Sequence, residues 1–257
     1  MEFEIGNSGR SRSGRKMDIF GDAFTQSRRL ESIDMAFYRF AAKCFREKVR
    51  VVFKGGCLIR HILGEFGEWQ MRGTRDLDFD LCEETYLIME EKWDDILRFN
   101  NKLRDAPFGG YMVNAVLYDG DVDCDVHVVP DVDLLASWIY TGPEGKFYGA
   151  RVEAVLSDKI VAMSSEKIVG RGRDLIDIKS FVTNKKIVEH LSFPVLKENL
   201  NKRILGDFSV FNSVPGRMVE TLKAYKENPS EIIRICEVFV TGLLSLGKTT
   251  WTGSVWK

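Results

Sequence analysis

Three aspartates alternate with apolar residues in one short stretch of the chain. Asp76, Asp78 and Asp80 are separated by Leu77 and Phe79, so on a strand the carboxylates would share one face and the apolar side chains the other. Aspartate is disfavoured in strands and like charges on one face repel, so such a face needs a compensating cation or a solvated edge. Carboxylate oxygens are the ligands that Mg²⁺ prefers. The pattern predicts a site for divalent cations, with a charged edge strand that only prevents pairing as the alternative.

A second acidic face is expected on a hairpin further along the chain. The segments YMVNAVLY and VDCDVHVV flank Asp119-Gly120, a step that favours a β-hairpin because both residues tolerate positive φ. Asp123 and Asp125 would then lie on one face of the second strand. If this strand neighbours the first aspartate strand, three carboxylates converge, and either residue can be the third. Cations held there could activate an attacking hydroxyl and steady a pyrophosphate leaving group.

A candidate phosphate cradle precedes the first aspartate strand. Residues 49–53 (VRVVF) have the composition of a strand and lead directly into Lys54, Gly55 and Gly56, after which a helix is expected. Unencumbered backbone amides at a strand-to-helix junction favour phosphate. The aspartates follow about 20 residues later, an order that would place a phosphate cradle beside metal ligands.

Taken together, residues 53–58 (FKGGCL) and 72–79 (RGTRDLDF) resemble the nucleotidyltransferase signature of the AbiEii/AbiGii toxin family. Residues 155–163 (VLSDKIVAM) and 173–178 (RDLIDI) resemble that family's later helix with a lysine and its RDxxDI element. The similarity covers residues 50–180, and Cys57 departs from the small hydroxyl residue often found after the two glycines.

The resemblance implies a role for each matched residue. Asp76 and Asp78 would be the paired metal ligands and Asp125 the third carboxylate, with Asp80 an extra one; together with Lys159 these three ligands would be the catalytic residues. Lys159 would neutralise triphosphate charge, and Asp174 or Asp177 would hold Lys159 or the acceptor. The residues implied to contact nucleotide are Lys54, Gly55, Gly56, Arg72, Thr74, Lys159, Asp174 and Asp177.

The activity implied is transfer of a nucleoside monophosphate from a nucleoside triphosphate to a hydroxyl acceptor, with Mg²⁺ or Mn²⁺ required. Members of the family are toxins of bacterial toxin-antitoxin or phage-defence systems, and some modify the acceptor end of tRNA. We therefore expect an RNA acceptor such as tRNA, and a cognate antitoxin is the implied partner. Two alternatives stay open: a transferase acting on a small molecule or a protein, and a non-catalytic module whose acidic face holds calcium or docks a basic protein.

Changes in hydrophobic period predict an α/β (α+β) head followed by a helical tail. The resemblance implies that the head is a minimal nucleotidyltransferase fold, with a short mixed sheet flanked by helices, and that the tail is a C-terminal helical bundle. We expect a flexible basic arm at 1–16, a head at 17–155 and a helical domain at 156–257, with the active cleft between the last two. The expected helices are 35–47, one opened by Gly55-Gly56, 84–104, one carrying Lys159, 189–205, 217–227 and 231–246; the expected strands are 49–53, 74–81, the hairpin pair and 151–155.

Composition limits the remaining classes. The 257 residues have a formal net charge of −1, which argues against a global electrostatic grip on nucleic acid. The five cysteines are scattered without a CxxC pair, so neither a zinc site nor a disulfide framework is expected. No apolar run approaches the roughly 20 residues that span a bilayer, and the amino terminus does not resemble a signal peptide. We expect a cytoplasmic protein with no membrane partner.

Overall fold

The computed structural model describes residues 23–67, 74, 76–106, 109–130, 137–164, 171–203, 208, 211, 214–245 and 250–256. Its elements in chain order are α1 (Ala23–Arg46), β1 (Val51–Lys54), α2 (Gly55–Glu65), β2 (Asp76–Cys82), α3 (Glu83–Lys92), β3 (Leu97–Asp105), β4 (Tyr111–Leu117), β5 (Val122–Val129), β6 (Ser137–Gly142), β7 (Gly145–Ala150), α4 (Val152–Met163), α5 (Gly172–Thr183), α6 (Lys185–His190), α7 (Phe193–Asn201), α8 (Gly216–Ala224) and α9 (Pro229–Leu244). The expected basic arm lies outside the described residues.

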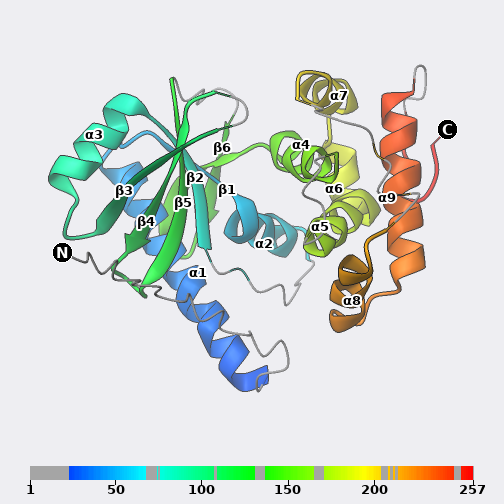
Figure 1. Ribbon diagram of the computed structural model, residues 1–257, viewed down its shortest axis with the longest axis horizontal. Coiled ribbons are helices and arrows are strands. Elements are labelled where there is room, and N and C mark those ends of the chain that lie inside the picture. Colours follow the sequence, from blue (N-terminus) through cyan, green and yellow to red (C-terminus); the bar gives the residue numbers. More distant parts are fainter. Residues whose placement is uncertain are drawn as a thin grey trace, which may run out of the picture.

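The described strands form one mixed sheet in the order β3-β4-β5-β2-β1-β7-β6. Strand β2 runs antiparallel to β1 and parallel to β5, while β1 runs parallel to β7. Figure 1 shows the sheet with α1 and α3 on one side of the molecule and the helices α4 to α9 gathered on the other. The predicted α/β class, with a mixed sheet flanked by helices and a helical second half, is therefore confirmed.

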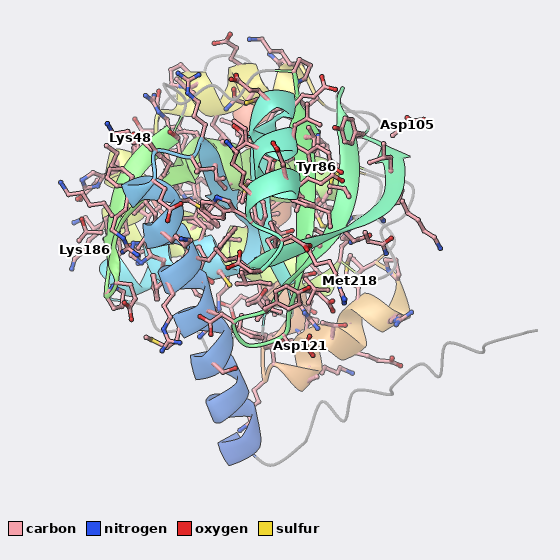
Figure 2. All side chains as sticks on the ribbon, turned by 90° about the vertical axis from the view of Figure 1, so that its left-hand side faces the viewer. Lys48, Tyr86, Asp105, Asp121, Lys186 and Met218 are labelled. Carbon is pink, nitrogen blue, oxygen red and sulfur yellow. The ribbon has the colours of Figure 1, made fainter. Side chains whose placement is uncertain are left out.

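The apolar face of the sheet forms the core of the strand-bearing half. On β2 the apolar residues Leu77, Phe79 and Leu81 are fully buried, while the intervening aspartates are only partly so. Phe40 of α1 packs against Phe79, with ring centroids 5.6 Å apart. Tyr86 of α3, labelled in Figure 2, packs against Phe99 of β3, with ring centroids 4.8 Å apart. Because α1 and α3 cover this face, the aspartates project from the opposite one.

Two predicted elements are wrong. The helix expected at 84–104 ends at Lys92, and the remainder is β3, whose residues pair with β4 from Leu97 to Asp105. The strand expected at 151–155 is the first turn of α4, because Val152, Val155 and Leu156 have helical spacing and are all buried. The strands that precede it, β6 and β7, were not predicted.

The second half consists of packed helices. The helix predicted at 189–205 begins later and ends earlier, as α7: α6, capped by Asn184, ends at His190, and a proline in the first turn of α7 starts a new helix. The helices predicted at 217–227 and 231–246 correspond to α8 and α9. In the part of the chain that the structure describes, no helix is long and apolar enough to cross a membrane.

Candidate active site

Strand pairing brings the two acidic segments together on one face of the sheet. The parallel register of β2 and β5 sets Asp76 opposite Asp123, Asp78 opposite Asp125, and Asp80 opposite His127. On the other side of β2, Lys54 of β1 lies opposite Asp78. The two acidic strands are therefore direct neighbours, and Asp125 is the residue that faces the central aspartate.

Gly55 brings the start of α2 against this acidic face. Its φ is +67°, and a Cβ atom built on it would lie 1.8 Å from Asp78 Oδ2 and 2.6 Å from Asp78 Cβ. No side chain fits at such distances, and positive φ is costly for residues other than glycine. The glycine predicted to belong to a phosphate cradle therefore lies beside Asp78, at the N-terminus of α2, where the first backbone amides have no partner within the helix.

The basic side chains around the acidic face do not fully compensate its carboxylates. Burial, reinforced by the Asp76 carboxylate, raises the pKa of Asp78 to about 6, although Lys159 and Lys54 act in the opposite direction. Burial and then Asp76 also raise the pKa of Asp125, against the opposing influence of its neighbours on β3 and β4. A raised carboxyl pKa means that the charged form is poorly compensated, so the face would gain stability from an added cation.

Asp80, the extra aspartate, is compensated within the protein itself. It forms an ion pair with Lys54, and His127 Nδ1 lies 3.3 Å from its Oδ1. Burial alone would raise the pKa of Asp80, but the hydrogen bond from His127 and the Lys54 charge outweigh it and hold the pKa below its usual value. Asp80 therefore differs from Asp76 and Asp78 in its surroundings, and Lys54 is engaged with it.

Lys159 lies between two carboxylates of the next helix. Its Nζ is 2.8 Å from Asp174 Oδ1 and 3.5 Å from Asp177 Oδ2, and its side chain is 15% exposed. Asp174 and Asp177 are three residues apart on α5 and thus share one helix face. Arg171 reaches the second oxygen of Asp174 at 3.4 Å. The helix with the lysine and the RDLIDI element form one buried ionic cluster.

A cavity of about 220 Å³ connects this cluster to the acidic face. It is lined by Lys54, Gly55, Asp78, Val155, Asp158, Lys159, Ala162, Arg171 and Asp174. The lining thus comes from the β1–α2 junction, from β2 and from the helices α4 and α5. The cavity thus lies between the sheet and the helical half, where the sequence predicts an active cleft.

Three further residues of the site were missed by sequence reasoning. Asp158 lines the cavity and forms an ion pair with Arg203, which lies just after α7. Asn114 donates from Nδ2 to Asp125 Oδ1 at 2.5 Å, and Arg104 donates to Asn114 Oδ1 at 3.0 Å. The hairpin turn alone could have indicated Asn114, because it fixes the register that sets Asn114 opposite Asp125. Arg104 had no such signal, since its segment was predicted to be helical.

Other predicted site residues have different positions. Thr74 is buried, and its Oγ1 donates to the Asp76 carbonyl oxygen at 3.1 Å, so it supports the aspartate rather than lining the cavity. Arg72 lies outside the described residues. Within the described ranges, no three His, Cys, Asp or Glu side chains come close enough together to hold a metal ion by themselves. Asp76, Asp78 and Asp125 share a face, and Mg²⁺ commonly takes only one or two carboxylates and completes its shell with water and phosphate oxygens.

Comparison with known proteins gives structural likenesses only. No protein-family model matches the sequence, and no curated protein matches it. The nucleotidyltransferase toxin MenT4 of Mycobacterium tuberculosis H37Rv is 16% identical with a TM-score of 0.47, and the alignment covers 77% of this chain and 70% of that one. An antigenic nucleotidyltransferase-like protein from Paracoccidioides brasiliensis is 14% identical with a TM-score of 0.43, covering 77% of this chain and 94% of that one. Likenesses of this degree assign no activity, which has to come from the chemistry of the site.

Proposed function

We propose that the protein is a nucleotidyltransferase that moves a nucleoside monophosphate from a nucleoside triphosphate onto a hydroxyl acceptor and releases pyrophosphate. One observation carries the proposal: a single cavity is lined by a glycine at a helix N-terminus, the carboxylate that it touches and a lysine held between carboxylates. Phosphate transfer requires these three elements, an amide cradle, an acidic face for a divalent cation and a fixed positive charge.

Several residues of the chain would together bind the nucleoside triphosphate. The open amides of Gly55 and Gly56 would bind phosphate oxygens at the start of α2. Lys159 would neutralise triphosphate charge, and its two carboxylate partners, Asp174 and Asp177, would fix its ammonium group at the cavity wall. Lys54 lines the same cavity and would add a second positive charge near Asp78.

The acidic face suits a resident Mg²⁺ or Mn²⁺ ion. Its donors are carboxylate oxygens, the ligands that these ions prefer, and burial together with the Asp76 carboxylate raises the pKa of Asp78, so an added cation would stabilise its charged form. We assign Asp76 and Asp78 as ligands and Asp125 as the third carboxylate. The ion would stabilise the charge that develops on the transferred phosphoryl group. Thr74 would orient Asp76, and Asp125 would accept the proton of the attacking hydroxyl.

The acceptor and the biological role rest on the sequence resemblance. It supports an RNA acceptor such as the end of a tRNA, a cytoplasmic toxin or phage-defence effector, and a cognate antitoxin as partner. We also propose that residues 17–155 form a head and residues 156–257 a helical domain. The last strand of the sheet, β7, ends at Ala150, and α4, the first of the consecutive helices α4 to α9, begins at Val152.

The test is incubation of the purified protein with each labelled nucleoside triphosphate, Mg²⁺ and total cellular RNA. We expect label on tRNA-sized species, and its loss in an Asp76→Ala/Asp78→Ala variant. A matched control is Asp94→Ala/Asp95→Ala, which removes two exposed aspartates from the turn after α3 and should label RNA normally.

Other outcomes separate the alternatives. Triphosphate binding that depends on Mg²⁺ without labelled RNA would redirect the search to protein or small-molecule acceptors. A protein that binds no triphosphate with Mg²⁺, and whose biological effect survives Asp78→Asn, would be a non-catalytic binding module, and the proposed activity would be wrong.

A further inference from the structure

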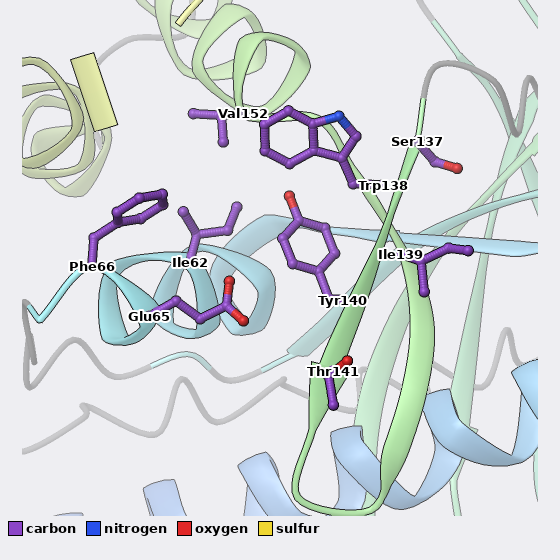
Figure 3. Close-up of a pocket in the computed structure, with 9 residues that line it drawn as sticks. All are labelled: Ile62, Glu65, Phe66, Ser137, Trp138, Ile139, Tyr140, Thr141 and Val152. Atoms are coloured by element: carbon purple, nitrogen blue, oxygen red, sulfur yellow. The ribbon is translucent and has the colours of Figure 1, made fainter. Parts of the chain in front are cut away.

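A second cavity, of about 570 Å³, lies between the C-terminal end of α2 and strand β6 (Figure 3). It is lined by Ile62, Glu65, Phe66, Ser137, Trp138, Ile139, Tyr140, Thr141 and Val152. Five of these residues are consecutive in β6. Successive side chains of a strand point to opposite faces, and Figure 3 shows Ile139 on the other side of β6 from Trp138 and Tyr140. A cavity that touches all five therefore follows the edge of the strand rather than one of its faces.

This edge is the end of the sheet. Strand β6 is last in the strand order and pairs on its inner side with β7. Among the described residues, no strand pairs with its outer side. An end strand presents backbone N–H and C=O groups that another extended chain can pair with.

The two ends of the sheet differ in chemistry. The opposite end strand, β3, carries Arg98, Lys102 and Arg104, the kind of charged side chains with which natural sheets prevent edge pairing. Strand β6 has the sequence SWIYTG, with no charge and no proline, and its Ile139 is 57% exposed. Only the β6 end is thus chemically open to another strand.

The cavity is lined by apolar and aromatic side chains and by one carboxylate. Ile62 of α2 and Phe66, the residue that follows α2, face Trp138 and Tyr140 of β6 across the cavity (Figure 3). Glu65 is the one charged residue among those that line it. A side chain entering from a paired strand would therefore meet aromatic surface, which suits an apolar or a cationic group, and a carboxylate, which suits a cationic one.

We propose that the outer edge of β6 binds an extended segment of a partner protein, which adds a strand to the sheet by main-chain hydrogen bonds. The segment would direct an apolar and a basic side chain, two residues apart, onto the aromatic wall and Glu65. A second copy of this chain fits less well, because its own β6 contains no basic side chain to pair with Glu65. The interaction does not involve the acidic face and is independent of the proposed nucleotidyl transfer.

The test uses a labelled peptide, Thr-Val-Thr-Lys-Thr-Val-Thr, and the purified full chain in a fluorescence anisotropy titration. In an extended peptide the valines and the lysine share one face. Two control peptides carry glutamate in place of the lysine, or proline in place of the two central threonines that flank it. We expect the lysine peptide to bind at least tenfold more tightly than the proline peptide, because proline cannot donate main-chain hydrogen bonds, and more tightly than the glutamate peptide.

Variants of the chain locate the site. Ile139→Lys places a charge on the open edge and should weaken binding at least tenfold, while Leu103→Lys, at an equally exposed position (57%) on the β3 end strand, should not change it. Glu65→Gln should weaken the lysine peptide about two- to fivefold, the range for a solvent-accessible ion pair. Thermal melting of each variant checks that the fold is kept.

Three results would overturn the proposal. They are no binding of the lysine peptide at millimolar concentration, equal loss of binding in Ile139→Lys and Leu103→Lys, and equal affinity for the lysine and glutamate peptides. Light scattering tests whether a second copy of the chain binds this edge instead. A chain that is dimeric in solution and becomes monomeric with Ile139→Lys would show that β6 pairs with the β6 of another copy, which would also overturn the proposal.

Discussion

Replacing Gly55 with alanine tests whether the start of α2 lies against the acidic face. The new Cβ would lie 1.8 Å from Asp78 Oδ2, 2.4 Å from Cγ and 2.6 Å from Cβ. Rotation of the Asp78 side chain about its Cα–Cβ bond can relieve the first two contacts, but the contact with Cβ can be relieved only by movement of the backbone. Restoring an ordinary contact of 3.4 Å from 2.6 Å requires a shift of about 0.8 Å between β2 and the β1–α2 junction.

That shift should cost more activity than stability. The left-handed conformation of residue 55 costs on the order of 1–3 kcal/mol for a residue with a side chain, which should lower the free energy of unfolding by that amount. A misplacement of roughly 1 Å in a phosphoryl-transfer site costs on the order of a hundredfold in rate. We therefore expect kcat/KM for nucleotidyl transfer to fall about a hundredfold in Gly55→Ala while the protein stays folded at room temperature.

The assay is steady-state transfer of labelled nucleotide, with urea unfolding measured on the same preparations. Gly216→Ala is the matched control, because that glycine opens α8 with nothing within 4 Å of the added Cβ and should keep full activity. If Gly55→Ala kept activity within about threefold of the unsubstituted chain, the junction could not lie against Asp78 and the proposed phosphate cradle would be misplaced.

Three further predictions concern stability and metal binding. Burial lowers the pKa of His61 from 6.5 to about 4, so at this residue the unfolded chain binds more protons between these values, and the contribution of His61 to the free energy of unfolding should fall by about 3 kcal/mol as the pH drops to 4. The raised pKa of Asp78 acts in the opposite direction over the same range, so the test is the difference between two proteins. Urea unfolding at both pH values should give a change that favours the folded state by about 3 kcal/mol more in His61→Asn than in the unsubstituted chain; equal changes would contradict this. Lys159→Met should lower the free energy of unfolding by about 3–5 kcal/mol, because it removes the Lys159 ammonium group from beside the fully buried carboxylate of Asp177. A loss under about 1 kcal/mol would show that this ion pair does not stabilise the fold. Asn114→Ala should weaken Mn²⁺ binding about tenfold or more, because Asp125 loses the donor that orients it. Titration calorimetry measures the affinity, and Asn100→Ala on the neighbouring strand β3 should leave it unchanged. Equal affinities in the two variants would count against the role of Asn114.

Local patterns in the sequence determined a large part of the candidate site. The alternation from Asp76 to Asp80 defined both faces of β2, since a strand has a period of two. The Asp119-Gly120 step defined the β4–β5 hairpin, and the two glycines after β1 marked the start of α2. These features could be predicted because turn chemistry and side-chain period act over only a few residues.

Pairing between distant segments was decided by the tertiary structure alone. The sequence left the third carboxylate open between Asp123 and Asp125, and only the register of β2 with β5 sets Asp125 opposite Asp78. Asp80 has the same local pattern as its neighbours, yet Lys54 and His127, from two other strands, give it different ionic partners.

Two other features also depended on contacts across the fold. The 84–104 segment was predicted to be one helix, but its second part is held as β3 by pairing with β4 and by the packing of Phe99 on Tyr86. The open edge of β6 follows from the order of strands in the sheet. The physical reason is common to all of these: which strands become neighbours depends on the free energy of the whole packed sheet, and no single segment contains that information.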